Sequence, residues 1–230
     1  MMVLRWLLLA GFLFSCSRNT VEQIEVVVPK DVAVPPDMAY IPSGEFIMGS
    51  PENHHTEEGR RAYLIDKYEV TEGQFRVYAP AHPFFAGKEK WPATHVTFEE
   101  ADQYCHQLSK RLPTEAEWEK AARGTDGRKW PWGVYLDHPN NGFSGFTPED
   151  VDNRREWISP YGVYGMGYNV WEWVDDWYSD GSGEKKFKVV RGGLTQTHLT
   201  VQFTPTYFSN WMVPDAAYNF VGFRCARDAG

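Results

Sequence analysis

Residues 162–177 read Gly162-Val163-Tyr164-Gly165-Met166-Gly167-Tyr168-Asn169-Val170-Trp171-Glu172-Trp173-Val174-Asp175-Asp176-Trp177. Three tryptophans, two tyrosines and three glycines stand there beside one glutamate and two aspartates, a mixture that fits neither an amphipathic helix nor an alternating strand. Large rings can anchor a core that has little regular structure, and glycines let two backbone segments approach closely. The stretch therefore predicts a packed turn whose free carbonyl groups could accept a hydrogen-bond donor or a cation.

The composition of the whole chain indicates a folded, acidic protein. It has 230 residues, 42% of them hydrophobic and 16% aromatic, which is enough for a real core. The formal net charge is -8, and the longest basic cluster is Lys185-Lys186-Phe187-Lys188. Because phosphate binding needs a surplus of Lys and Arg, this charge argues against a nucleic-acid partner. No repeat or change of composition divides residues 38–230, so we expect one domain there.

The first fifteen residues have the features of an export signal. Arg5 supplies a positive charge, and residues 6–14 form an apolar run of nine residues, about half of the roughly 18 that a membrane-spanning helix needs. The run ends in Leu13-Phe14-Ser15-Cys16, which resembles a bacterial lipobox. We expect residues 1–15 to be a lipoprotein signal peptide and Cys16 to be acylated. The alternative is an ordinary cleaved signal peptide that leaves an unpaired thiol.

Acylation at Cys16 predicts an exported protein that is lipid-anchored in the cell envelope. Ser17 follows the cysteine, which in a Gram-negative cell indicates the outer membrane. Two cysteines then remain, Cys105 and Cys225, and an oxidising compartment favours a bridge between them. Two buried free thiols are the alternative, because two cysteines alone cannot prove a bridge.

The segment before the first helix is expected to contain a tether, a hairpin and a loop. Residues 16–37 lack a helical period and end rich in proline, which is typical of a tether. Residues 38–50 alternate around Pro42-Ser43-Gly44 and predict a hairpin, and residues 62–70 predict a strand. The polar segment between them predicts a loop. On that loop, His54 and His55 are more simply solvated than a metal pair, since no third ligand stands nearby.

Three helices are predicted by one start signal, a threonine followed three residues later by Gln or Glu. The helices should begin after Thr71, Thr97 and Thr114 and end near Tyr78, Lys110 and Gly124. In the third helix, Glu115 and Glu117 could form an acid/base pair. We favour a simpler role, in which acidic side chains in a first turn interact with the helix dipole.

The rest of the chain is expected to be irregular with a few strands. Residues 127–161 contain many Pro, Gly, Asn and Asp and no long periodic run, which is typical of binding or ion-held loops. Residues 187–193, 195–207 and 219–226 each predict a strand.

Several blocks of the sequence stand in an order that is itself informative. The most specific one is Arg111-Leu112-Pro113-Thr114-Glu115-Ala116-Glu117-Trp118-Glu119-Lys120-Ala121-Ala122-Arg123-Gly124. Residues 38–50 and 69–75 precede it, and Pro131-Trp132-Gly133, Asn169-Val170-Trp171-Glu172-Trp173, Arg191-Gly192-Gly193 and Gly222-Phe223-Arg224-Cys225 follow. Together they resemble the formylglycine-generating enzyme family, also called the sulfatase-modifying factor family. Over residues 38–228 the resemblance implies an α+β, C-type-lectin-like fold with unusually little regular secondary structure.

The resemblance does not extend to the copper site of the family's oxidases. Those enzymes bind copper through two cysteines shortly after the Arg-Gly-Gly motif, because thiolates are soft ligands that suit Cu(I). Residues 194–214 of this chain contain no cysteine, and by spacing Thr197 and Gln202 stand where the thiolates would be. The arginine that is usual in the following strand is also absent, with Ser209 and Asn210 nearby. We therefore expect no copper.

Two other features of the family are implied for this chain. One is a disulfide between Cys105 and Cys225. The other is a calcium site, with a carboxylate from Glu172 and backbone carbonyls from Tyr168 and Val170 as hard oxygen ligands. Gly165 stands where the family usually has Asp or Asn, so a ligand is missing and the site should be weak or empty. A second family calcium site would lie around residues 140 and 141, which are both asparagine.

Loss of the copper ligands on a retained framework favours a non-catalytic, membrane-tethered binding or scaffold protein that recognises a protein or surface ligand. One alternative is a formylglycine-generating oxidase of sulfatase cysteine. The other is a diversified C-type-lectin-fold surface receptor, a retroelement variable protein, because some bacterial lipoproteins of this fold vary near the C-terminus.

A ligand-binding surface is expected in the C-terminal part of the chain. Thr197 and Gln202 would form the polar floor of a pocket. The aromatic and Asn residues nearby are typical of a recognition surface, although they could equally be core. They are Tyr207, Phe208, Asn210, Trp211 and Tyr218.

Overall fold

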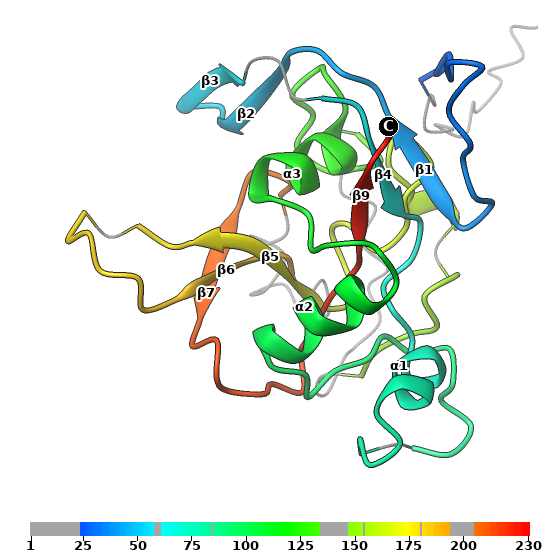
Figure 1. Ribbon diagram of the computed structural model, residues 1–230. Coiled ribbons are helices and arrows are strands. Elements are labelled where there is room, and N and C mark those ends of the chain that lie inside the picture. Colours follow the sequence, from blue (N-terminus) through cyan, green and yellow to red (C-terminus); the bar gives the residue numbers. More distant parts are fainter. Residues whose placement is uncertain are drawn as a thin grey trace, which may run out of the picture.

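The computed structural model describes residues 24–57, 61–83, 85–133, 147–153, 155–179, 181–193 and 205–230. Their elements are, in chain order, β1 (Met38–Ile41), β2 (Phe46–Ser50), β3 (Asn53–Glu57), β4 (Tyr63–Asp66), α1 (Glu72–Tyr78), α2 (Phe98–Gln107), α3 (Glu115–Arg123), the short 3-10 helix η1 (Arg155–Trp157), β5 (Trp171–Trp177), β6 (Lys188–Gly192), β7 (Ser209–Met212), β8 (Val221–Gly222) and β9 (Ala226–Asp228). These strands pair as β1-β4-β9, as β2-β3 and as β7-β6-β5-β8 (Figure 1). The fold is α+β and C-type-lectin-like, with little regular structure, as expected.

The three helices begin where the sequence predicts them. In each, the threonine hydroxyl accepts a hydrogen bond from the N–H three residues later, and the Gln or Glu side chain there accepts one from the threonine N–H. α2 ends at Gln107, earlier than expected, and the φ of 56° at Ser109 marks where the chain leaves the helical path. α3 ends before Gly124, whose φ of 71° suits glycine.

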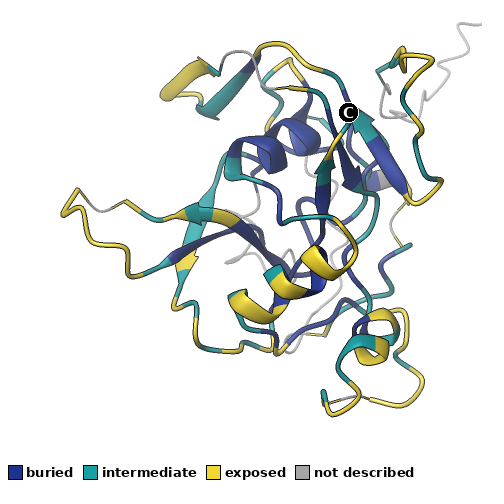
Figure 2. Ribbon diagram, in the orientation of Figure 1, coloured by how far each residue is buried: buried dark blue, intermediate teal, exposed yellow. Residues whose placement is uncertain are grey.

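The helix α3 is buried on nearly all sides, whereas α1 and α2 expose one face to solvent (Figure 2). Its charged residues other than Glu115 are buried, and each of them has partners within the fold. Lys120 Nζ donates to the carbonyl oxygens of Pro42 and Gly44, both at 2.7 Å. Burial of a charge is costly unless it is paired or hydrogen-bonded, so these contacts fix α3 against the β1–β2 connection.

The hairpin predicted over residues 38–50 is wrong. Met38 pairs with Asp66 on β4, and Phe46 pairs with Glu57 on β3, so the two strands belong to different sheets. The turn between them is drawn onto α3 by the two hydrogen bonds of Lys120, and Gly44 has a φ of 114°. The strands therefore diverge after the turn.

The loop predicted before Arg61 is also wrong in part, because residues 53–57 form β3 and pair with β2. Both neighbouring histidines are exposed on this strand, where His55 Nε2 lies 3.2 Å from Glu57 Oε2. A strand that is polar on both faces shows no alternation of apolar and polar residues, so the sequence pattern does not reveal it.

The packed turn predicted for residues 162–177 is correct only up to Val170, because the remainder forms β5. This strand is antiparallel to β6 and parallel to β8. Trp171 and Trp173 are buried, and so are Glu172 and Val174 between and after them. A strand with both faces buried lacks the polar alternation that normally identifies one.

The C-terminal strands differ from the prediction in their bounds. Most of the strand expected over residues 195–207 lies outside the described residues, and β7 begins at Ser209. The strand expected over residues 219–226 is divided into β8, which extends the four-stranded sheet, and β9, which pairs with β4. The last strand therefore closes the domain against its first sheet.

The disulfide between Cys105 and Cys225 is present, with the two Cα atoms 5.6 Å apart. It joins α2 to the chain just before β9 across a sequence separation of 120 residues. A loop of this length corresponds to about 4 kcal/mol of stabilisation in the chain-entropy account. Both cysteines belong to a buried core cluster that also contains Phe75, Trp173 and Phe223.

Part of the expected tether lies on the domain. Ile24 and Val26 pack against a second core cluster around α3, β1 and β4, and the Ile24 N–H donates to the Pro160 carbonyl at 3.0 Å. Ordered contacts therefore begin before Met38. Cys16 and the rest of residues 1–23 lie outside the described residues.

Candidate functional site

A buried ion cluster occupies the place where the resemblance implies calcium. Arg224 Nε donates to Glu172 Oε2 and Arg224 Nη2 donates to Glu172 Oε1, both at 2.7 Å. Trp118 Nε1 also donates to Glu172 Oε2, at 2.9 Å. All three residues are fully buried. The Glu172 carboxylate is thus held by three donors, two of them on a cation.

Glu69 is the second carboxylate of this cluster. Its Oε1 accepts from Asn169 Nδ2 at 3.1 Å, and its Oε2 lies 3.8 Å from Arg224 Nη2 without a hydrogen bond to any described residue. Complete burial and, to a smaller extent, the Glu172 carboxylate raise the pKa of Glu69 to about 7, against the opposing effect of Arg224. A Cβ at Gly165 would lie 2.5 Å from the Glu69 carboxyl carbon. The Glu69 carboxyl group therefore fills the space that a side chain at position 165 would need.

This donor set does not fit a calcium ion at Glu172. The guanidinium of Arg224 already supplies a positive charge between the two carboxyl groups, and a divalent cation would have to displace it. Over the described part of the chain, His, Cys, Asp and Glu form no group of three or more that could hold a metal. Calcium binding stays a prediction, and residues 140 and 141 lie outside the described ranges.

A second buried ion cluster connects α3 to the end of β6. Arg191 donates to Glu115 and Glu119, both at 2.7 Å, and Arg123 donates to Glu119 at 2.6 Å. Glu117 instead pairs with Arg111 at 2.7 Å. The two first-turn glutamates that could have formed an acid/base pair are thus held in separate ion pairs, as structural residues in the first turn of α3.

The second cluster also fixes the chain on both sides of residues 194–204. On one side, Arg191 and Gly193 are buried at the end of β6. On the other, Thr206 is fully buried, its carbonyl accepts from Arg191, and its hydroxyl donates to the Arg128 carbonyl at 3.0 Å. Thr197 and Gln202 fall within the undescribed segment between these anchors.

The residues expected at a ligand-binding surface divide into two groups. Phe208 and Tyr218 pack against the core, with ring centroids 6.2 Å from Trp171 and 6.3 Å from Trp173 respectively. Tyr207 is half-buried with its ring 5.6 Å from the Arg123 guanidinium. Asn210 and Trp211 lie on β7, and the Asn210 side-chain oxygen accepts from the Trp211 N–H at 2.9 Å.

Trp211 is the centre of an aromatic group at the surface that we call the aromatic strand surface: Tyr178, Phe187 and Trp211. Trp211 is 42% exposed, and its ring centroid lies 4.4 Å from that of Phe187 and 5.6 Å from that of Tyr178. The strands β5, β6 and β7 lie side by side here, and the chain between β5 and β6 projects away from the body (Figure 1). Exposed aromatic clusters of this kind are typical of contact surfaces.

Sequence reasoning missed Glu69, Glu119 and Arg123 as parts of the buried clusters. One signal was available for α3, because Glu115, Glu119 and Arg123 recur every four residues and so share a helix face. No comparable spacing identifies Glu69, which meets Arg224 only through the tertiary fold.

The comparisons with known proteins agree with this architecture. The family model of the Sulfatase-modifying factor enzyme 1-like domain matches residues 23–229. A formylglycine-generating enzyme of Streptomyces coelicolor is 32% identical over 179 residues, which cover 62% of this chain and 54% of that protein. The Bos taurus protein named inactive C-alpha-formylglycine-generating enzyme 2 is also 32% identical over 179 residues, covering 66% and 56%. The chain thus spans about half the length of these relatives.

Solved structures share the fold at lower identity. Treponema denticola variable protein 1 superposes with a TM-score of 0.69 at 22% identity, covering 83% of this chain and 94% of that one. CarF superposes with a TM-score of 0.69 at 19% identity, covering 86% and 100%. PvdO from Pseudomonas aeruginosa has a TM-score of 0.66 at 22% identity, with coverage of 88% and 100%.

Proposed function

This chain belongs to the family of the Sulfatase-modifying factor enzyme 1-like domain, and we propose that it is a non-catalytic, membrane-tethered binding or scaffold lipoprotein of that family. In this role it recognises a protein or a surface ligand. The observation that carries the proposal is the placement of its three cysteines. Cys105 and Cys225 are bonded to each other, and Cys16 stands in the lipobox-like stretch. No thiol pair is left that could hold Cu(I).

The retained framework supports a binding role. Buried ion pairs fix α3, the end of β6 and Thr206 as one unit, so the chain on either side of residues 194–204 has a rigid base. Binding segments that are held by a rigid scaffold are a common arrangement. One relative carries the name of an inactive enzyme, which is consistent with use of this domain without turnover.

The aromatic strand surface is the place where we expect the protein ligand to bind. Trp211 is 42% exposed although its ring could contribute a large apolar area to a core. Tryptophan and tyrosine are enriched among the residues that dominate binding energy at interfaces.

A site-specific photo-crosslinker placed at position 211 tests this assignment in cells. We expect an adduct of one discrete mass from position 211. The same crosslinker at position 85 is the matched control, because Phe85 is 63% exposed outside the aromatic strand surface and should give no such adduct. An absence of adducts from position 211, in folded and correctly localised protein, would contradict a protein ligand on this surface.

The membrane tether is proposed from the sequence around Cys16. Within the described ranges, no helix is long and apolar enough to cross a membrane. A diacylated and N-acylated cysteine would supply the anchor, since more than one hydrocarbon chain is needed for stable attachment.

A diversified surface receptor is the second candidate, favoured by the similarity in fold to a protein titled variable protein 1. In such a receptor, residues near β7 would differ between copies while the buried clusters would not. A reverse transcriptase gene and a near-repeat of the 3′ end beside this gene would select this candidate. A neighbouring sulfatase gene would instead favour the oxidase.

A further inference from the structure

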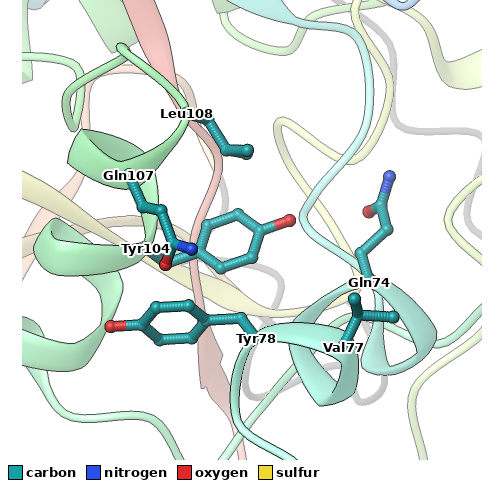
Figure 3. Close-up of a pocket in the computed structure, with 6 residues that line it drawn as sticks. All are labelled: Gln74, Val77, Tyr78, Tyr104, Gln107 and Leu108. Carbon is teal, nitrogen blue, oxygen red and sulfur yellow. The ribbon is translucent and has the colours of Figure 1, made fainter.

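A cleft lies between α1 and α2. Its cavity of about 290 Å³ is lined by Gln74, Val77, Tyr78, Tyr104, Gln107 and Leu108 (Figure 3). The tyrosine rings meet edge to face at 5.4 Å, and the rim is formed by Val77 and Leu108, which are 84% and 51% exposed. The volume is near the lower end of the range for small-molecule sites, about 300 Å³. In Figure 1 the helix α1 lies well apart from β7.

The cleft continues into a second, more polar cavity of about 140 Å³. Gln74, Tyr104 and Leu108 line both cavities, so the two adjoin. The charged residues of the second cavity are three carboxylic acids and one lysine, namely Asp37, Asp66, Glu69 and Lys110.

Only one of these charges is exposed and unpaired. Asp66 is paired with Lys110 at 2.6 Å, and Glu69 is fully buried and bonded to Asn169. Asp37 is exposed, and among the described residues its carboxylate has no ion pair. The nearby Lys67 ammonium donates to the Pro36 carbonyl, at 2.8 Å. The polar end of the cleft therefore presents a carboxylate that has no ion pair with any described residue.

The Tyr104 hydroxyl lies where the apolar and polar parts meet. It points into the gap between Leu108 and Gln74 (Figure 3) and has no hydrogen bond to any residue that the structure describes. Burial raises the pKa of Tyr104 to about 12, so the group is a neutral hydroxyl at physiological pH. It is available to accept a hydrogen bond from a ligand.

We propose that this cleft binds a small organic cation with a hydrocarbon body. The hydrocarbon lies between Tyr78, Tyr104 and Leu108, and the ammonium group lies toward the Tyr104 hydroxyl and Asp37. Apolar walls with a few placed polar groups are the usual composition of such sites. A tyrosine face also attracts a cation. The site is independent of the aromatic strand surface and of the function proposed for it.

Three probes of nearly equal size test the proposal on the purified protein by ligand-observed NMR titration. They are 2-phenylethylammonium, neutral 2-phenylethanol and anionic 3-phenylpropionate. We expect saturable binding of the cation with a Kd of about 1 mM, an affinity ordinary for so few atoms. The anion should bind at least about fivefold more weakly than the cation. The difference is modest because it comes from one exposed carboxylate, that of Asp37, which attracts the cation and repels the anion.

The variants separate this site from others. Asp37→Asn should weaken the affinity for the cation about three- to fivefold and leave the affinity for 2-phenylethanol unchanged, because only the charge interaction is removed. Leu108→Ala should weaken the affinity for both probes, because it removes part of the apolar wall. Asp37 and Leu108 are exposed, so neither substitution should disturb the fold. Trp211→Ala should change neither affinity.

Three results would overturn the proposal: no saturable binding of the cation up to about 10 mM, equal affinity for the anion, or an unchanged cation affinity in Asp37→Asn. Loss of cation binding in Trp211→Ala would place the site elsewhere. Because the crosslinking at position 211 uses a different surface and a different class of ligand, failure of one experiment does not imply failure of the other.

Discussion

Single residues in this domain illustrate how buried charges are accommodated. Arg224 is fully buried and donates two hydrogen bonds to Glu172, and its guanidinium also lies near Glu69. Two carboxyl groups and one guanidinium leave one negative charge uncompensated when both acids are ionised. Glu69, which has the weaker contacts, therefore holds its proton to a higher pH than usual.

We predict that the stability of the protein decreases as pH rises through neutrality. The pKa of Glu69 is about 7 in the folded protein against an ordinary value of 4.5, so the folded state binds the proton more tightly than the unfolded state. The resulting stabilisation is complete below about pH 4.5 and is lost as pH rises through 7, by about 3 kcal/mol in all. Urea unfolding at pH 5 and pH 8 measures it.

Glu69→Gln is the matched variant, because it keeps an oxygen for Asn169 and cannot ionise. The difference in unfolding free energy between pH 5 and pH 8 should shrink in this variant. Asp37→Asn should retain the full difference, since its carboxylate is exposed. If Glu69→Gln shows the same pH dependence as the wild type, Glu69 is not its source.

A double-mutant cycle tests the pair of Glu172 and Arg224. Removal of either partner should cost about 3–5 kcal/mol of unfolding free energy, because an unpaired charge then stays buried. The double variant Glu172→Gln, Arg224→Met should cost less than the sum by about 1–3 kcal/mol, the usual coupling of contacting residues. Additive losses, measured by urea unfolding, would mean that the two side chains do not stabilise each other.

At the scale of elements, the helices could be predicted and much of the strand pairing could not. A capping box is a local signal that involves four consecutive residues, so the starts at Thr71, Thr97 and Thr114 follow from the sequence. Strand pairing depends on contacts that are distant in sequence. β1 and β2 separate because Lys120, on α3, binds the carbonyl groups of the turn that joins them.

Some features of the candidate site could be predicted from the sequence, and others depend on the tertiary fold. The absence of thiols after the Arg-Gly-Gly motif and the bonding of Cys105 to Cys225 were both accessible from the sequence, through its resemblance to a family. The sequence did not show which aromatic residues are exposed. Tyr218 and Trp211 are equally apolar and near in sequence, but Tyr218 packs against Trp173 while Trp211 lies outside.

Two tryptophan substitutions distinguish core from surface on two strands of the same sheet. Trp211→Ala on β7 should cost about 1–2 kcal/mol of unfolding free energy, because two ring contacts are lost, and abolish the interaction with the protein ligand. Trp173→Ala on β5 should cost about 3–5 kcal/mol, because this ring is fully buried. The measurement is urea unfolding. A loss in Trp211→Ala comparable to that in Trp173→Ala would show that Trp211 belongs to the core.

At the scale of the whole molecule, the chain is closed by contacts between its ends. The strand β9 pairs with β4, and the disulfide ties the chain before β9 to α2. Ile24 packs on the domain near Pro160, so the chain is already held against the domain at this residue. Lipidation at Cys16 would therefore leave a short connection between the bilayer and the domain.

We predict that Cys16 is acylated in cells that have the lipoprotein pathway. The wild-type protein should partition with membranes, with a mass that corresponds to a lipid-modified Cys16 as the first residue. Cys16→Ser should not be processed by lipoprotein signal peptidase, and it should retain residues 1–15. Intact-mass spectrometry of the membrane fraction measures both. A variant that is processed and retained in membranes like the wild type would contradict lipidation at this residue.

The central claim is that the chain uses the fold of formylglycine-generating enzymes without their oxidation chemistry. The most direct measurement is mass spectrometry of a sulfatase-motif peptide that has been incubated with the purified, copper-loaded protein under oxygen, beside an active family member as control. The account predicts no conversion of the peptide cysteine, because Cys105 and Cys225 are bonded and no other thiol pair exists. A mass loss corresponding to formylglycine, abolished by a Cu(I) chelator, would contradict it.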